Sequence, residues 1–86
     1  MPYSVEFLDA AIVDMERLDK KIAHRIIGRI KWLSENFDVI KPISLKGKLT
    51  GLFKLRVGDY RIIYQIIRGE KLIMIHAIGH RKDIYL

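Results

Sequence analysis

Two stripes of apolar residues at helical spacing mark the first half of the chain. The first has the spacing i, i+3, i+4, i+7 and i+10 and comprises Leu8, Ala11, Ile12, Met15 and Leu18. The second comprises Ile22, Ile26, Ile30, Leu33 and Phe37. Each stripe predicts an amphipathic helix, and Asp19 suits the N-cap of the second helix. Almost no linker separates the stripes, so we expect an antiparallel αα-hairpin.

Shorter apolar runs predict four β-strands. Residues 3–7 alternate between polar and apolar side chains, as in a half-buried strand. Three further runs, at residues 52–57, 60–68 and 71–79, are separated by Gly58-Asp59 and Gly69-Glu70, which suit tight hairpin turns. We therefore expect one α+β domain over residues 1–86, with the order β-α-α-β-β-β. The first strand would lie at one edge of a three-stranded antiparallel meander.

The turn at Gly58-Asp59 decides which side chains of the first hairpin share a face. A two-residue turn pairs Val57 with Tyr60 and Arg56 with Arg61. One face is then apolar and should pack on the helices, with Phe53, Leu55, Val57, Tyr60, Ile62 and Tyr64. The other face carries Lys54, Arg56 and Arg61. Like charges opposed at about 5 Å destabilise a hairpin, which favours an anion site over side chains that merely extend into screened solvent.

Composition and charge narrow the range of functions that the chain could have. The net charge is +6, and residues 41–86 hold ten bases against three acids, an excess that attracts polyanions. The chain has no cysteine, which excludes disulfides and thiolate metal sites. We find neither a leader sequence nor an apolar run of membrane-spanning length, and therefore expect a cytoplasmic protein with no membrane partner.

A tight turn at Gly69-Glu70 would extend the cationic face onto the last meander strand. This register pairs Ile63 with His76 and Arg61 with Ile78, and it brings His80 near Arg61. Strict alternation would direct Arg81 to the opposite face unless Gly79 kinks the strand. The cationic side would also carry an uncovered apolar strip that suggests a protein partner, made of Ile63, Ile67, Leu72, Met74 and Ile78.

The segments KLRVGDYRIIY (residues 54–64) and GHRKDIY (residues 79–85) resemble the RelE/ParE superfamily of bacterial and archaeal type II toxins. The resemblance covers essentially the whole chain and implies a twisted antiparallel sheet against a helical hairpin. It implies an mRNA endoribonuclease, without metal or cofactor, that acts in the ribosomal A site through the 2′-hydroxyl of the RNA. It also implies a RelB-like antitoxin as partner, with operator DNA bound only through that antitoxin.

The resemblance assigns catalytic positions residue by residue. Lys54 matches the first lysine of the family motif, and Arg61 matches the arginine after the turn. Arg56 stands where the best-known ribosome-dependent members have lysine. The matching positions near the C-terminus are His80, Arg81 and Tyr85.

The chemistry of such a cleavage fits these residue types. It requires a base, a group that stabilises the phosphorane and an acid. Lys54 is a credible base because neighbouring cations disfavour its charged form, whereas Arg56 can act only electrostatically and Arg61 can bind phosphate oxygens bidentately. The acid stays open between His80, the better acid near neutral pH, and Arg81, which the resemblance favours.

The remaining candidates concern RNA binding. Tyr85 could stack on a base or pack on the domain edge. Lys46, Lys48 and Lys82 are candidate contacts to the mRNA backbone or to ribosomal RNA, although each could be solvated surface. No His, Asp and Glu set has chelating spacing, so we expect no metal site.

Two other functions stay open. A ParE-like member would inhibit DNA gyrase without nuclease activity, and an inactive relative would act only in a repressor complex with its antitoxin. The presence of Lys54, Arg61, Arg81 and Tyr85 favours the nuclease, because gyrase-directed relatives usually lack that set.

Overall fold

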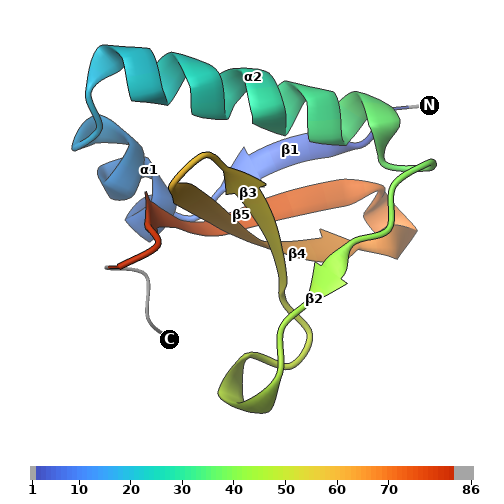
Figure 1. The fold of residues 1–86 in the computed structure, drawn as a ribbon. Coiled ribbons are helices and arrows are strands. Elements are labelled where there is room, and N and C mark those ends of the chain that lie inside the picture. Colours follow the sequence, from blue (N-terminus) through green and yellow to red (C-terminus); the bar gives the residue numbers. More distant parts are fainter. Residues whose placement is uncertain (1, 83–86) are drawn as a thin grey trace.

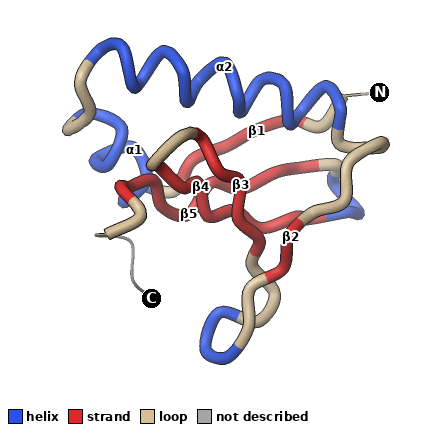
Figure 2. Tube along the Cα trace, viewed as in Figure 1, coloured by secondary structure: helices blue, strands red, loops and turns tan. Residues whose placement is uncertain are grey.

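Two helices cover one side of a five-stranded sheet in the computed structural model, which describes residues 2–82 of the 86-residue chain (Figure 1, Figure 2). The helices are α1 (Asp9–Glu16) and α2 (Lys20–Asn36). The strands are β1 (Ser4–Phe7), β2 (Ile43–Ser44), β3 (Phe53–Val57), β4 (Tyr60–Ile67) and β5 (Leu72–His80). Neither helix within the described residues has the length and apolar character needed to cross a membrane.

The sheet has the strand order β1-β5-β4-β3-β2. Strands β3, β4 and β5 form the predicted antiparallel meander, and β1 lies at an edge as expected. The α+β class is therefore confirmed, but β1 runs parallel to β5, so the sheet is mixed rather than antiparallel. The predicted strand order also lacked β2, whose two residues pair with β3 inside a segment that we expected to be a connection.

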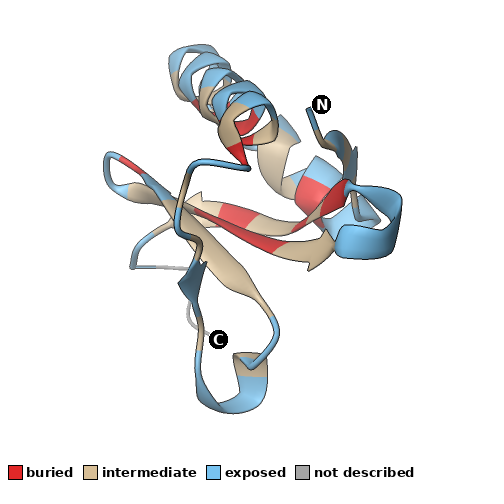
Figure 3. Ribbon diagram, turned by 90° about the vertical axis from the view of Figure 1, so that its right-hand side faces the viewer, coloured by how far each residue is buried: buried red, intermediate tan, exposed pale blue. Residues whose placement is uncertain are grey.

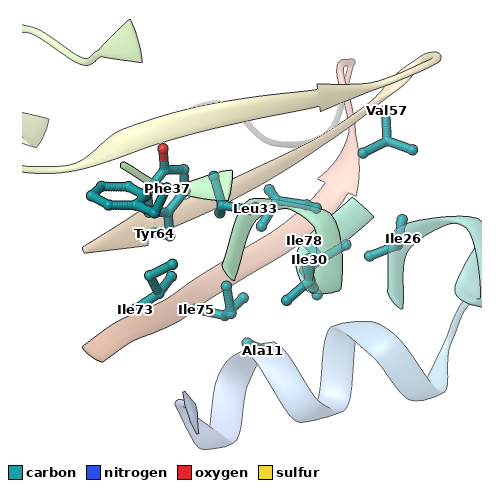
Figure 4. Packing of buried hydrophobic residues seen from close by; sticks show 11 residues of the cluster. Ala11, Ile26, Ile30, Leu33, Phe37, Val57, Tyr64, Ile73, Ile75 and Ile78 are labelled. Atoms are coloured by element: carbon teal, nitrogen blue, oxygen red, sulfur yellow. The ribbon is translucent and has the colours of Figure 1, made fainter. Parts of the chain in front are cut away.

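The core lies between the helices and the sheet (Figure 4). Three members of the second predicted stripe, Ile26, Ile30 and Leu33, are buried in α2, and Ala11 is the fully buried residue of α1. The sheet contributes the side chains that share one face of the meander, among them Val57, Ile62, Tyr64, Ile73, Ile75 and Ile78. The predicted packing of the apolar hairpin face on the helices is thus correct.

Helix α1 completes the sheet where β1 stops. Strand β1 accompanies β5 only as far as the pair Phe7 and Ile75. Beyond it, the backbone N–H of Ile78 donates a hydrogen bond of 3.0 Å to Oδ2 of Asp14 on α1. A strand edge without a partner leaves backbone donors unsatisfied, so this carboxylate takes the place of a neighbouring strand.

Burial of Tyr64 in this core predicts a loss of stability at alkaline pH. Desolvation raises the pKa of Tyr64 from 10.0 to about 12. Below pH 10 the phenol of Tyr64 is protonated in both the folded and the unfolded protein. Above pH 10 this phenol ionises in the unfolded chain first, so the free energy of unfolding falls as the pH rises toward 12. We expect the wild type to lose about 2 kcal/mol more than Tyr64→Phe between pH 8 and 11.5. Urea unfolding of both proteins across this range measures the difference, and parallel curves would contradict the prediction.

Candidate functional site: the cationic face of the β3–β4 hairpin

The β3–β4 hairpin has the register that its turn predicts. Val57 pairs with Tyr60, Arg56 with Arg61 and Leu55 with Ile62. Gly58 opens the turn with φ +60°, a backbone conformation that other residues rarely adopt. The turn therefore sets the faces of both strands.

The side of this hairpin away from the helices carries Lys54, Arg56 and Arg61, and we call it the cationic face. Arg56 and Arg61 are direct cross-strand partners, and Lys54, paired with Ile63, is diagonal to Arg61. Within residues 2–82, no carboxylate oxygen lies within 4.0 Å of a nitrogen of these three side chains. Their charges are therefore not neutralised by the described part of the chain.

Arg61 combines this charge with an unsatisfied donor. Its side chain is only partly exposed, and its Nε is buried with no hydrogen-bond partner among the described residues. A buried donor without an acceptor costs about 1–3 kcal/mol of stability. Among the described residues, Nε of Arg61 therefore adds no hydrogen bond to the fold, which favours a functional role for this side chain.

We predict that Arg56→Ala and Arg61→Ala leave the fold intact or stabilise it by up to about 1 kcal/mol, because opposed like charges repel. Thermal melts of the isolated protein at low salt test this, and added salt should shrink the gain in stability by screening the repulsion. A large loss of stability in either variant would refute the prediction.

A β-bulge corrects the predicted register of the second hairpin. The pairs from Ile67 with Leu72 to Tyr64 with Ile75 follow the expected spacing, but the register shifts between Ile63 and Tyr64. His76 is the extra residue, so Ile63 pairs with Ala77 rather than with His76. Because a bulge adds one residue to its strand, every later side chain of that strand lies on the face opposite to the one predicted.

The bulge changes the positions of the two candidate acids. Arg61 pairs with Gly79 instead of Ile78, and His80 pairs with Tyr60 on the helix-facing side, so our expectation that His80 lies near Arg61 on the cationic face was wrong. The rings of His80 and Tyr60 meet edge to face with centroids 5.4 Å apart. Strand β5 ends at His80, and Arg81 follows it in a turn. If the alternation of side chains continued past the strand end, Arg81 would point toward the cationic face.

Arg81 is held at the turn end of the hairpin by Asp59. Its backbone N–H donates to the Asp59 carbonyl oxygen at 2.8 Å, and its Nε lies 4.0 Å from Asp59 Oδ1. Both side chains are at least half exposed, and such pairs contribute about 0–1 kcal/mol. An incoming phosphate could therefore displace this carboxylate at little cost.

Two further expectations on β5 were wrong. The connection after β4 is a short 3₁₀ helix (Arg68–Glu70) followed by Lys71 at φ 48°, not a two-residue turn. The five residues of the expected apolar strip also do not form an uncovered surface. Ile63 and Leu72 are buried, and Ile78 belongs to the core under the helices.

The three lysines predicted to bind RNA lie outside the two strands that carry the cationic face. Lys46 and Lys48 are exposed on a projecting arm between β2 and β3, around the 3₁₀ helix Gly47–Leu49 (Figure 3). Lys82 follows β5, and its backbone N–H donates to Nδ1 of His80 at 3.2 Å. Tyr85 lies outside the described residues.

Comparison with known proteins gives the family. The family model described as the ParE toxin of the type II toxin–antitoxin system parDE matches residues 5–85. This chain belongs to that family. The toxin is also 34% identical to Toxin RelG of Mycobacterium tuberculosis over 89 aligned positions, which cover 99% of this chain and 98% of the relative. Toxin RelE of the same organism is 34% identical over 86 positions, covering 98% and 87%. The RelE/ParE resemblance is thereby confirmed.

Solved structures share the toxin's fold. The matching chain of the M. tuberculosis toxin–antitoxin complex RelBE2 has a TM-score of 0.85 at 28% identity, covering 96% of this chain and 95% of that one. An archaeal RelE–RelB complex from Pyrococcus horikoshii OT3 matches with a TM-score of 0.70 at 29% identity, covering 96% and 99%. The isolated Escherichia coli RelE toxin, at 19% identity, has the same fold with a TM-score of 0.76 over 91% and 83%.

The toxin's structure adds two partners that sequence reasoning missed. In the sequence Asp59 is recognisable only as a turn residue, and its pairing with Arg81 depends on the end of β5. Gln65 Oε1 accepts a hydrogen bond of 3.0 Å from Nε2 of His76 at the bulge. No sequence signal marked the bulge itself. Within residues 2–82, no group of three His, Asp or Glu side chains could hold a metal ion.

Proposed function

We propose that this toxin is an mRNA endoribonuclease that cleaves at the cationic face in the ribosomal A site. The observation that carries the proposal is the direct pairing of Arg56 with Arg61, with no carboxylate of residues 2–82 beside them. Two unpaired arginines on adjacent strands form a fork that suits phosphate. The RelE-like relatives support the same class of activity.

In the proposed reaction, Lys54 accepts the proton of the 2′-hydroxyl, whose oxygen attacks the adjacent phosphorus. Arg61 and Arg56 stabilise the charge that develops on the non-bridging oxygens. The bond to the 5′-oxygen breaks, leaving a 2′,3′-cyclic phosphate and a 5′-hydroxyl. Arg81 stabilises the leaving oxygen, which takes its proton from water, and the bulge favours this residue over His80. Tyr85 keeps its proposed role of stacking on a base.

The antitoxin-free protein on translating ribosomes tests this function. Primer extension should reveal new cuts at A-site codons, and a supercoiling assay should show no inhibition of DNA gyrase. Because the matching family model is named for ParE, gyrase inhibition is the second candidate. Gyrase inhibition without cuts would refute the nuclease. Absence of both effects would indicate an inactive relative that acts only through its repressor complex.

We propose a RelB-like antitoxin as the cytoplasmic partner that silences the toxin and links it to operator DNA. Three structural neighbours above 25% identity are toxin–antitoxin complexes, which supports this partner. Lys46, Lys48 and Lys82 are proposed contacts to mRNA or ribosomal RNA, since exposed lysines add affinity through phosphate contacts.

A further inference from the structure

A second cationic feature adjoins the proposed catalytic face at the edge of β3 and shares residues with it. A cleft of about 530 Å³ separates α2 from the turn end of β3. Its lining comprises Arg25, Gly28, Arg29, Arg56, Val57 and Gly58, with no acidic residue. Figure 1 shows the turn between β3 and β4 lying under α2 at this point. The cleft shares Arg56 with the cationic face, because β2 pairs only with residues 53 and 54 and leaves the rest of the β3 edge uncovered.

Two of these arginines lie against identifiable neighbours. A Cβ atom at position 58 would lie 3.1 Å from Nη2 of Arg25, so Gly58 makes room for this guanidinium. The guanidinium of Arg29 lies over the ring of Trp32, 4.3 Å from its centroid. Side chains that are already ordered lose less entropy when they bind a ligand. Arg29 is therefore preordered for an anion, and Gly58 leaves space for Arg25 beside it.

Helix α2 has two sequence features beside this cleft that lower the stability of the helix. Lys21, Arg25 and Arg29 follow one another at four-residue spacing, where like charges repel. Gly28 lies in the interior of the helix, where glycine is unfavourable, and a Cβ there would meet no atom within 4 Å. Packing thus does not require this glycine. Both features are explained if a ligand approaches the helix between Arg25 and Arg29.

An exposed aromatic side chain continues the cleft. Trp32 is 36% exposed and lines a second, smaller hollow of about 140 Å³ together with Arg29, Lys41 and Lys54. Arg29 borders both hollows, which join into one groove between α2 and β3. The smaller hollow is also lined by apolar side chains, among them Ile40, Ile43 and Leu55. Arginines that bind phosphates beside a ring that stacks on bases are typical of single-stranded RNA recognition.

We propose that this α2–β3 groove binds a single strand of RNA beyond the scissile phosphate, with phosphates on Arg25 and Arg29 and a base on Trp32. The proposal rests on the proposed function and extends its substrate contact around the edge of β3. The strand is a continuation of the mRNA or a segment of ribosomal RNA, which present the same chemistry.

Trp32 is the single tryptophan of the chain, so its fluorescence reports on the groove directly. The probe is a short 2′-O-methyl oligouridylate, which cannot be cleaved through a 2′-hydroxyl. We expect saturable quenching by the full-length toxin. Arg25→Gln combined with Arg29→Gln should weaken binding by about tenfold or more at moderate salt. It should also lower the salt slope by about 1–1.5, from two lost phosphate contacts.

The matched control is Arg17→Gln combined with Arg68→Gln, which removes the same charge from exposed residues outside the groove. The proposal predicts a much smaller effect in this control. Equal weakening in both double variants, or no quenching, would overturn the proposal. Quenching by a polyglutamate peptide but not by the oligonucleotide would assign the groove to a protein and also overturn it.

Ultraviolet cross-linking of Trp32 on translating ribosomes separates the two RNA sources. A cross-link to mRNA or to ribosomal RNA supports the groove and names its occupant, whereas a cross-link to neither counts against it. The oligonucleotide arm does not depend on catalysis. Oligonucleotide binding without A-site cuts would therefore refute the proposed nuclease but not the RNA-binding groove. A-site cuts without oligonucleotide binding would refute the groove but not the nuclease.

Discussion

Lys54→Ala or Arg61→Ala is expected to reduce A-site cleavage by about 10²–10⁴-fold while the protein stays folded. Lys54 is the proposed base, and Arg61, on the strand opposite Arg56, is the proposed phosphate-binding residue. Neither side chain pairs with a carboxylate of residues 2–82, so its loss leaves no buried charge behind. Primer extension on translating ribosomes measures the cuts, and circular dichroism verifies the fold.

Two conservative variants sharpen this test. Lys54→Arg keeps the positive charge but cannot release a proton, so it should be as inactive as Lys54→Ala if Lys54 is the base. Arg68→Ala, in the exposed connection after β4, removes one positive charge away from the site and should cleave normally. Full activity of Lys54→Arg would contradict the role of base and leave only an electrostatic one.

The second large effect concerns the core. Leu33→Ala is expected to lower the free energy of unfolding by about 2–5 kcal/mol, because the side chain is fully buried and its removal leaves a cavity. A chain of this size has a total stability of roughly 4–13 kcal/mol. This one substitution therefore removes a large share of that stability, since few other core residues can compensate in a small domain.

Ile27→Ala is the matched control on the same helix. Ile27 is 53% exposed, so its truncation removes less buried surface and should cost below about 1 kcal/mol. Urea unfolding of both variants with an unchanged m-value would establish the difference. Similar losses at both positions would mean that α2 does not bury the face that its apolar stripe predicts.

The cationic face could be predicted because its causes are local. The turn at Gly58 and Asp59 has two residues, and strand side chains alternate, so the partners of Arg56 and Val57 follow by counting. The stripe of α2 is equally local, because the helical period alone decides that Ile26, Ile30 and Leu33 share the buried face. Neither inference needed a contact between distant parts of the chain.

The far end of the site could not be predicted in this way. Counting from the second turn gave the right partners up to Tyr64 and the wrong ones beyond it, because one extra residue enters β5 at His76. Just after this bulge, the backbone N–H of Ile78 donates to the carboxylate of Asp14. These two residues are 64 positions apart in the sequence. Such a contact between α1 and the sheet edge leaves no periodic signal in β5.

By itself, the sequence determined the helices, the meander and the cluster of cations on its first hairpin, since spacing and turn length act over a few residues. Only the tertiary structure decided that β1 runs parallel to β5, that the bulge places His80 on the helix-facing side, and that α2 and β3 enclose a basic groove. These features depend on which distant segments satisfy each other's backbone groups and cover each other's apolar surface, and that choice is made by the whole fold.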